Sequence, residues 1–290
     1  MSCQVDAHCH LWTLSRGDYG WLDPQNPALK PIARDFGFGD LVAADGRSEN
    51  TKRVVVQAAP TVAESVFLLN LATRHRDIAA VVGWVDLSGE DAPKILSELA
   101  TDPRFKGVRP MLQDIANVDW ITTQPRPDAI AALVEYRLTF DALVLPQHLQ
   151  ALHRFATANP DLPIVIDHAA KPALGAGASD PRHGLWRDGM RRLAQGTNAC
   201  CKLSGLLTEL APEQRANARE HLMPIVADLL DWFGPARLMW GSDWPVVNLA
   251  ADYDAWRRLT EELLAEVDTD GLSQIYAGTA RRFYELEVTT

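Results

Sequence analysis

Short, nearly continuous apolar runs alternate along the chain with longer stretches in which apolar residues recur every three or four positions. The short runs are typical of buried strands, and the longer spacing is typical of helices that bury one face. The predicted strands span residues 5–10, 53–58, 78–87, 105–112, 138–145, 163–169, 199–204 and 237–242. The predicted helices span 61–76, 92–100, 128–136, 147–158, 186–194, 213–233 and 253–267.

This order of elements predicts an α/β protein with a parallel sheet. We count eight β-then-α units, the first with the long segment 11–50 in place of a helix, and right-handed crossovers can close them into a (β/α)8 TIM barrel. The strands are apolar throughout, as strands covered on both faces must be. A doubly wound open sheet is the alternative, but the chain lacks the glycine-rich phosphate turn after its first strand. We therefore expect residues 1–290 to form a single barrel domain.

Two segments fall outside this pattern. Residues 11–50 form a long first loop, rich in Gly, Pro and Asp, that carries the aromatic residues Trp12, Tyr19 and Trp21. A loop of this length in a compact domain is usually functional, so we expect a lid or a sugar-stacking wall, with plain packing as the alternative. Residues 270–290 read as an extra C-terminal helix, which we expect to pack on the outside of the barrel.

Composition excludes several classes of partner. The formal net charge is −10 and the chain has no run of Lys and Arg, so a nucleic-acid partner is not expected. The four cysteines include no Cys-x-x-Cys pair, which suits a reducing compartment. No window approaches about 18 consecutive apolar residues, and no basic region precedes an apolar stretch at the amino terminus. We therefore expect a cytoplasmic protein that makes no membrane contact.

Four polar residues lie at predicted strand ends, where TIM barrels build their sites. His8 and His10 share one side of the first strand, because alternate residues of a strand point the same way. His168 follows the sixth strand, and Asp243 follows the eighth. Each has a structural alternative, such as a core histidine or a turn aspartate before a proline. In a closed barrel strand eight adjoins strand one, so their combination favours a functional site.

Two imidazoles and a carboxylate suit one divalent ion of the zinc class with a position left open for water. We expect His8, His10 and Asp243 as the metal ligands. Asp243 could also take a proton from water and later return it to a leaving group. With His168 beside it, this set predicts hydrolysis at a carbonyl.

Other residues near strand ends are expected to bind the substrate. Arg109 could hold a carboxylate or polyol oxygen with its planar fork, or could form an ion pair at the barrel rim. Lys202 is a cation in an apolar strand and needs a partner, for which Glu209 is a candidate. The substrate-binding candidates are Trp12, Trp21, Gln57, Trp84, Arg109, Gln113, Lys202 and Trp244.

Six sequence blocks resemble a known superfamily. DAHCHLW at residues 6–12 resembles the opening of the amidohydrolase superfamily. The other blocks look like its sugar-lactonase branch, which includes L-fuconolactonases, rhamnono- and galactono-lactonases and, more distantly, 2-pyrone-4,6-dicarboxylate lactonases. They are VQAAPT at 56–61, VGWVDL at 82–87, DHAAKP at 167–172, CKLSGL at 201–206 and GSDWP at 241–245. The resemblance extends from about residue 4 to residue 286.

The resemblance implies a distorted barrel that opens a cyclic ester of a sugar acid. It assigns water activation to Asp243 and metal binding or substrate polarisation to His8, His10 and His168. Relatives in this branch can work with little or no metal, and then Arg109, Lys202 or a histidine would stabilise the oxyanion. Strand four lacks a bridging lysine and strand five ends without a histidine, so a binuclear centre is not expected. Pro110 stands where a histidine would be expected after Arg109.

The sequence thus predicts a hydrolase of carbohydrate catabolism that opens an L-fucono-, L-rhamnono- or galactono-lactone to the aldonate. One divalent metal, zinc first, is the expected cofactor and could be dispensable. A decarboxylase or carbon–carbon hydrolase of the same superfamily is the alternative enzyme. A non-catalytic ligand-binding barrel is the remaining alternative, and the intact Asp243, His8 and His10 argue against it.

Overall fold

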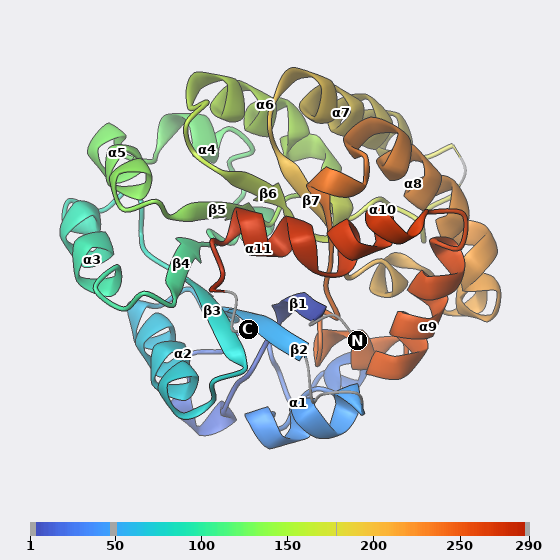
Figure 1. The fold of residues 1–290 in the computed structure, drawn as a ribbon, viewed down its shortest axis with the longest axis horizontal. Coiled ribbons are helices and arrows are strands. Elements are labelled where there is room, and N and C mark those ends of the chain that lie inside the picture. The colour runs from blue at the N-terminus through green and yellow to red at the C-terminus, as the bar shows by residue number, and fades with distance from the viewer. Residues whose placement is uncertain (1–3, 47–50, 178, 288–290) are drawn as a thin grey trace.

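The computed structural model describes residues 4–46, 51–177 and 179–287. Its eight strands are parallel and lie in chain order around a barrel, with helices outside them (Figure 1), so the predicted TIM barrel is confirmed. The strands are β1 Gln4–Cys9, β2 Thr51–Val56, β3 Ile78–Gly83, β4 Phe105–Val108, β5 Thr139–Ala142, β6 Ile164–Ile166, β7 Cys200–Leu203 and β8 Leu238–Trp240.

The barrel closes between the end of β1 and the residues just beyond β8. The amide of His10 donates to the carbonyl oxygen of Trp244 at 2.7 Å, and the amide of Asp243 donates to the carbonyl oxygen of His8 at 2.8 Å. An isolated parallel bridge pairs Cys9 with Trp244. The closing hydrogen bonds therefore involve the residues predicted to carry the chemistry.

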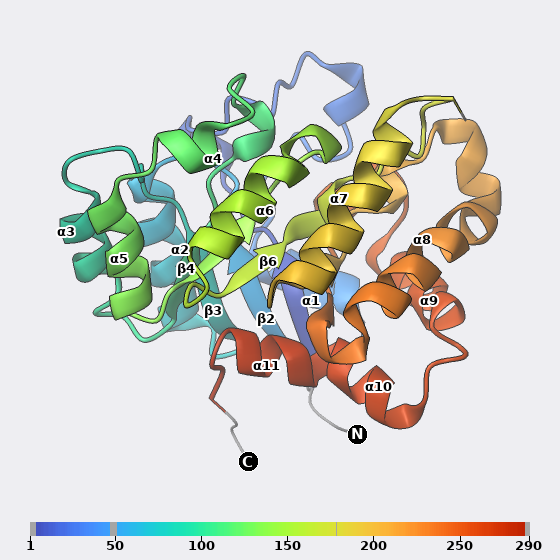
Figure 2. The ribbon, with the colours of Figure 1, turned by 90° about the horizontal axis from the view of Figure 1, so that it is seen from above.

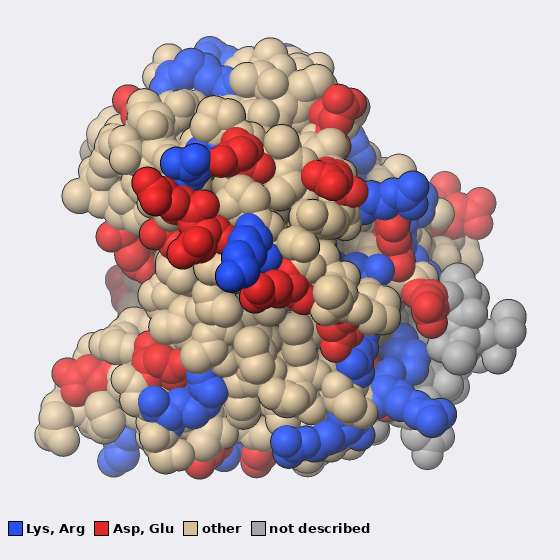
Figure 3. Space-filling model, turned by 90° about the vertical axis from the view of Figure 1, so that its left-hand side faces the viewer, with Lys and Arg blue, Asp and Glu red and all other residues tan. Residues whose placement is uncertain are grey.

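The outer ring of helices surrounds the sheet in both ribbon views (Figures 1 and 2). Within the described residues, no helix is long and apolar enough to cross a membrane. On the face that includes α3 and α5, Lys and Arg are interspersed with Asp and Glu (Figure 3). The helices are α1 Phe38–Asp45, α2 Val62–Arg74, α3 Ala92–Leu99, α4 Trp120–Thr123, α5 Pro127–Glu135, α6 Leu149–Ala158, α7 Arg182–Gly196, α8 Ala218–Phe233, α9 Tyr253–Leu263, α10 Thr269–Ser273 and α11 Thr279–Phe283.

Two apolar clusters make up the core. The larger packs the outward faces of the strands against the helices. The smaller one includes Val5, Ala7, Val54 and Val56 and also takes in Tyr284 from the C-terminal segment. β1 has one more residue than β2 between Asp6 and Cys9, which marks a β-bulge.

Several strands are shorter than predicted. The predicted strand 78–87 ends at Gly83, and the predicted strand 163–169 ends at Ile166. In both, buried residues continue beyond the last paired residue, Val85 and Leu87 after β3 and residues 167–169 after β6, so the sequence pattern could not mark where pairing ends. The long first loop also contains a helix, α1, that the sequence pattern did not predict.

The C-terminal segment lies in a different place from the one expected. A π-helical turn, Gln274–Gly278, and α11 extend across the barrel end that contains the amino terminus (Figures 1 and 2). Tyr284 is buried, and its hydroxyl donates to Oδ2 of Asp141 on β5 at 2.7 Å. The segment therefore closes the bottom of the barrel instead of packing on its outside.

The first loop is attached to α2 through a buried carboxyl group. The Tyr19 hydroxyl donates to Oε2 of Glu64 at 2.7 Å, and the amide of Ala58 donates to Oε1 at 3.2 Å. The indole of Trp21 donates to the carbonyl oxygen of Ala58 at 2.7 Å, which holds the same loop to the end of β2. Burial raises the pKa of Glu64 to about 7.

This raised pKa predicts a pH-dependent stability. The folded protein retains a proton on Glu64 that the unfolded chain, with the ordinary pKa of 4.5, has already released. The free energy of unfolding should therefore fall as pH rises from 4.5 through about 7, with Glu64 contributing about 3 kcal/mol. Glu64→Gln should make this slope shallower in urea unfolding measured at several pH values. Asp6, whose pKa burial raises to about 6, titrates in the same range and keeps the slope from vanishing.

The matched control is Glu266→Gln, which changes an exposed carboxylate and should keep the wild-type slope. An unchanged slope in Glu64→Gln would contradict the assignment of this titration to Glu64.

Candidate active site

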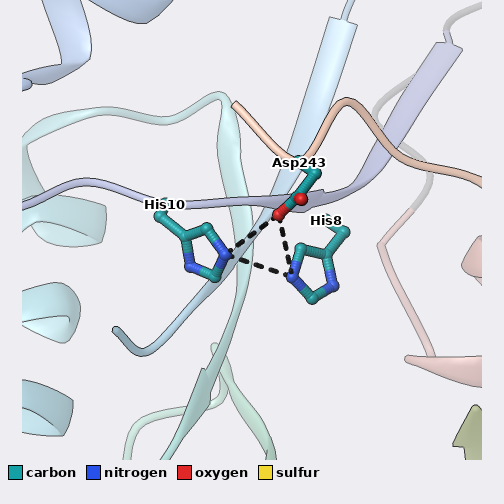
Figure 4. A group of neighbouring side chains, drawn as sticks. All are labelled: His8, His10 and Asp243. Atoms are coloured by element: carbon teal, nitrogen blue, oxygen red, sulfur yellow. Dashed lines mark hydrogen bonds and ion pairs between the residues drawn. The ribbon is translucent and has the colours of Figure 1, made fainter. Parts of the chain in front are cut away.

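Three predicted metal ligands meet at the carboxyl end of the barrel (Figure 4). Nε2 of His8 lies 3.2 Å from Nε2 of His10, and Oδ1 of Asp243 lies 3.3 Å from Nε2 of His10 and 3.8 Å from Nε2 of His8. All three side chains are buried. One strand end and the turn after β8 therefore bring three donor atoms to one point.

The ring of His10 has a defined tautomer. Its Nδ1 lies 2.8 Å from the carbonyl oxygen of Val56, which can only accept, so the Nδ1 proton is donated there. The lone pair of Nε2 is then free to bind a cation. This arrangement, in which the second ring nitrogen bonds to a backbone carbonyl, is typical of metal-binding histidines.

The ring of His8 has two neighbours that favour opposite tautomers. Its Nδ1 lies 3.0 Å from Nζ of Lys202, which donates, and 3.3 Å from Oδ1 of Asp167, which accepts. With the Nδ1 proton given to Asp167, the Nε2 lone pairs of both histidines face Asp243 and need a cation between them. With Lys202 donating instead, Nε2 of His8 carries the proton and donates to His10. Burial and the charge of Lys202 lower the pKa of His8, which keeps the ring neutral in both cases.

The spacing of the three donor atoms fits a metal ion. Zinc ligands lie about 2.0–2.2 Å from the ion in a tetrahedron, so neighbouring donors are roughly 3.3 Å apart. The observed separations of 3.2, 3.3 and 3.8 Å are close to this value. Two imidazole nitrogens and one carboxylate oxygen are also a donor set that zinc accepts.

Asp243 is held by its backbone as well as by the histidines. Its φ is 55°, a left-handed conformation that few residues other than Gly and Asn adopt, and its amide bonds to His8. Although burial favours the protonated carboxyl group, electrostatic interactions with His168, His10 and Lys171 lower the pKa of Asp243. A carboxylate that stays ionised can accept a proton from water.

His168 completes the group around Asp243. Its Nε2 lies 3.9 Å from Oδ1 of Asp243, and its Nδ1 lies 2.9 Å from the hydroxyl of Ser204 after β7. Gly205, with φ of 63°, permits this contact, because a Cβ there would stand 2.6 Å from Nδ1 of His168. Three imidazoles therefore surround one carboxylate.

A cavity of about 180 Å³ opens onto this group. Sites for drug-sized ligands span about 300–1,000 Å³, so this cavity suits a smaller molecule such as a single sugar ring. Its lining residues are His10, Trp21, Ala58, Arg109, Met111, Gln113, Asp114, Leu143, His168, Lys171, Thr208, Asp243 and Val246.

Arg109 and Gln57 hold each other in place beside the cavity. The amide group of Gln57 donates to the carbonyl oxygen of Arg109 at 2.7 Å, and Nη2 of Arg109 donates to the carbonyl oxygen of Gln57. Nη1 of Arg109 lies 3.8 Å from Oδ2 of Asp167. The structure thus contains both the cavity position and the ion pair that the sequence left as alternatives for Arg109.

Below His8 lies a buried cluster of charges. Nζ of Lys202 is 2.6 Å from Oδ2 of Asp141 and 3.0 Å from Oδ1 of Asp167, and all three side chains are completely buried. Although burial disfavours the ammonium, the two carboxylates raise the pKa of Lys202. The partner suggested by the sequence, Glu209, is not within ion-pair distance of Lys202, so that suggestion was wrong.

The structure brings most of the predicted site residues together, but not all of them face the cavity. Trp12 and Trp244 are buried and pack against Phe36 behind the site. Lys202 lies beneath His8, and Gln57 supports Arg109. Trp84 lines a separate cavity of about 280 Å³, which shares Met111 and Asp114 with the first.

Sequence reasoning missed Asp141, Asp167 and Lys171 as site residues. A carboxylate inside the apolar strand TFDA was a usable signal for Asp141, since a charge in a covered strand needs a buried partner. Asp167 directly precedes His168, and only the side chain of His168 was predicted to belong to the site. Lys171 follows the end of β6 by several residues, and it reaches the cavity because of the backbone conformation of the loop between them.

The chain is similar to known proteins over nearly its whole length. A family model described as amidohydrolase matches residues 5–286. A curated L-fucono-1,5-lactonase of Burkholderia ambifaria is 44% identical, over 99% of this chain and 97% of its own. Another, of Burkholderia multivorans, is 34% identical over 98% and 96%. A crystal structure of a Burkholderia multivorans amidohydrolase with bound zinc superposes with a TM-score of 0.88 and 33% identity, over 99% of this chain and 100% of that one.

The contact between Tyr284 and Asp141 predicts a measurable contribution to stability. Tyr284→Phe removes one donor from a buried carboxylate, so the free energy of unfolding should fall by about 1–3 kcal/mol in urea titrations. The control, Tyr136→Phe, alters an exposed hydroxyl at the end of α5 and should change stability by less than about 0.5 kcal/mol. Equal effects of the two changes would contradict a stabilising role for this hydrogen bond.

Proposed function

The chain belongs to the amidohydrolase family, and we propose that its substrate is L-fucono-1,5-lactone or a sugar-acid lactone of closely similar shape. The resemblance drawn from the six sequence blocks is confirmed, and with it the prediction of a hydrolase that opens sugar-acid lactones. Two full-length relatives bear the name of one lactonase, which supports this substrate over the acid that a decarboxylase would take.

One observation carries the proposed chemistry. The Asp243 carboxylate lies within 4 Å of three buried imidazoles at the edge of a cavity with room for one sugar ring. Oδ1 faces the histidines, which leaves Oδ2 for the attacking water. The surrounding groups keep this carboxylate ionised, so it can act as a general base.

In the proposed reaction Asp243 moves one proton. It takes a proton from water as the water oxygen bonds to the lactone carbonyl carbon. The bond between this carbon and the ring oxygen then breaks, and Asp243 returns the proton to the ring oxygen, which becomes a hydroxyl group. The product is the open aldonate, which loses its carboxyl proton to solvent. His168 holds Asp243 in position throughout.

The proposed cofactor is one divalent ion, with zinc the first candidate. His8, His10 and Asp243 would hold it, through the donor atoms whose spacing fits zinc. When bound, the ion would supply Lewis-acid polarisation of the lactone carbonyl and make the attacking water more acidic. A zinc-bound structure of a relative at 33% identity supports this choice.

The remaining cavity residues are proposed to bind the sugar. Trp21 offers an aromatic face, and its indole nitrogen is already bonded to Ala58, so the ring is held firmly. Gln113 can donate to and accept from hydroxyl groups. Arg109 adds guanidinium nitrogens at the cavity wall. These groups are expected to set the preference among sugar lactones.

Asp243→Asn tests the general base. The amide cannot take up a proton, so kcat for lactone hydrolysis should fall by about 10²-fold to 10⁴-fold. Proton release from a panel of 1,4- and 1,5-aldonolactones, followed with a pH indicator, measures this. Asp86→Asn, an exposed carboxylate outside this cavity, should leave the rate unchanged. Full turnover by Asp243→Asn would refute the assigned role.

Metal content tests the ion site independently of activity. His10→Ala removes one proposed ligand, so the zinc bound per chain after dialysis should fall at least tenfold, as measured by elemental analysis. His153→Ala, on α6, is the control and should keep the wild-type content. The wild-type rate before and after chelation then shows whether turnover depends on the ion. Equal zinc contents in the two variants would exclude His10 as a ligand.

A further inference from the structure

The loop after β6 has an unusual backbone. Four consecutive residues, from His168 to Lys171, have φ between 49° and 58°. This left-handed region is unfavourable for residues with a Cβ, and a run of such residues is rare. The turn is held by a 2.9 Å hydrogen bond from the amide of Lys171 to the carbonyl oxygen of His168, and by Trp186, whose indole donates to Ala169 at 2.6 Å.

The turn places two side chains at the cavity. His168, at its start, approaches Asp243, and Lys171, at its end, lines the same cavity. Lys171 is half-buried, and its charge acts on Asp243, His168 and Glu209. The ammonium group is therefore close to the reacting centre.

Lys171 differs from the other cations of the site in having no fixed partner. Arg109 is bonded to the carbonyl oxygen of Gln57 and lies near Asp167, and Lys202 is paired with Asp141 and Asp167. In the described part of the chain, the ammonium of Lys171 makes neither an ion pair nor a side-chain hydrogen bond. Its three N–H donors are free for an oxygen of a bound molecule.

We propose that Lys171 is a catalytic residue that binds the acyl oxygen of the lactone and then the carboxylate of the aldonate product. This inference rests on the proposed lactonase function and adds to it the position where negative charge gathers. Arg109 and Lys202 are less suited to this role, because their charges are already shared with buried carboxylates.

The chemistry requires no proton from Lys171. As the water oxygen bonds to the carbonyl carbon, the π electron pair moves onto the carbonyl oxygen, and the ammonium stabilises this charge by hydrogen bonding. When the tetrahedral intermediate collapses, the pair returns, the bond to the ring oxygen breaks, and Asp243 supplies the proton that the ring oxygen needs. The new carboxylic acid loses the remaining proton of the attacking water to solvent, and the resulting carboxylate stays beside Lys171.

Lys171→Met tests the proposal through rate and anion binding together. It should lower kcat about 10²-fold to 10³-fold, the loss typical of one oxyanion donor. It should also weaken inhibition by the aldonate product at least tenfold, while inhibition by the neutral polyol of the same sugar stays within twofold. Lys171→Arg keeps the charge and should recover part of both losses.

Lys106→Met, on β4 away from this cavity, is the matched control and should behave as the wild type in every assay. Thermal unfolding of all variants shows whether each is folded. An unchanged kcat and unchanged aldonate inhibition in folded Lys171→Met would overturn the proposal, as would equal weakening of aldonate and polyol.

The same design separates this inference from the lactonase proposal. Absence of lactone turnover by the wild type would defeat the proposed function alone. Calorimetric binding of the aldonate to the wild type and to Lys171→Met would still decide whether Lys171 forms an anion position. Aldonate affinity that is the same in both proteins would then defeat the inference on Lys171.

Discussion

Two backbone hydrogen bonds between the ends of β1 and β8 support the whole site. They join His8 to Asp243 and His10 to Trp244, at the point where the barrel closes. Because closure and the proposed catalysis use the same residues, the distance from Asp243 to the two histidines depends on main-chain geometry. A barrel that failed to close here would separate the carboxylate from both imidazoles.

Beneath this junction lies a set of buried charged side chains, in a place that apolar side chains could also fill. Lys202, Asp141 and Asp167 are buried together, and such a group is costly to desolvate unless its members satisfy one another. Its position against Nδ1 of His8 gives it a function, because the balance between Lys202 and Asp167 sets which nitrogen of His8 carries the proton. The proposed chemistry at the cavity therefore depends also on buried residues that do not line it.

Much of the fold and the centre of the site could be predicted from the sequence. The eight apolar runs marked the strands, and barrel closure then required His8, His10, His168 and Asp243 to be neighbours. These residues lie at strand ends, where sequence position fixes spatial position. The strand ends themselves were overestimated, since buried loop residues are as apolar as strand residues.

The parts that could not be predicted depend on backbone conformation and on distant pairing. Lys171 reaches the cavity only because four residues adopt left-handed dihedral angles, and nothing in DHAAKP demands them. The hydrogen bond from Tyr284 to Asp141 joins residues 143 positions apart, and no local pattern connects them. Trp12 was expected to bind substrate, but aromatic residues in a loop and in a core look alike in sequence.

The contact made by Tyr284 also has a consequence for biosynthesis. Synthesis proceeds from the amino terminus, so His8 and His10 emerge from the ribosome before Tyr284, which follows all eight strands along the chain. Until then Asp141 lacks one of its donors and the lower end of the barrel is open to water. The charge balance beneath His8 is thus completed only after Tyr284 has emerged, so a nascent chain with all eight strands folded but without Tyr284 lacks this electrostatic environment.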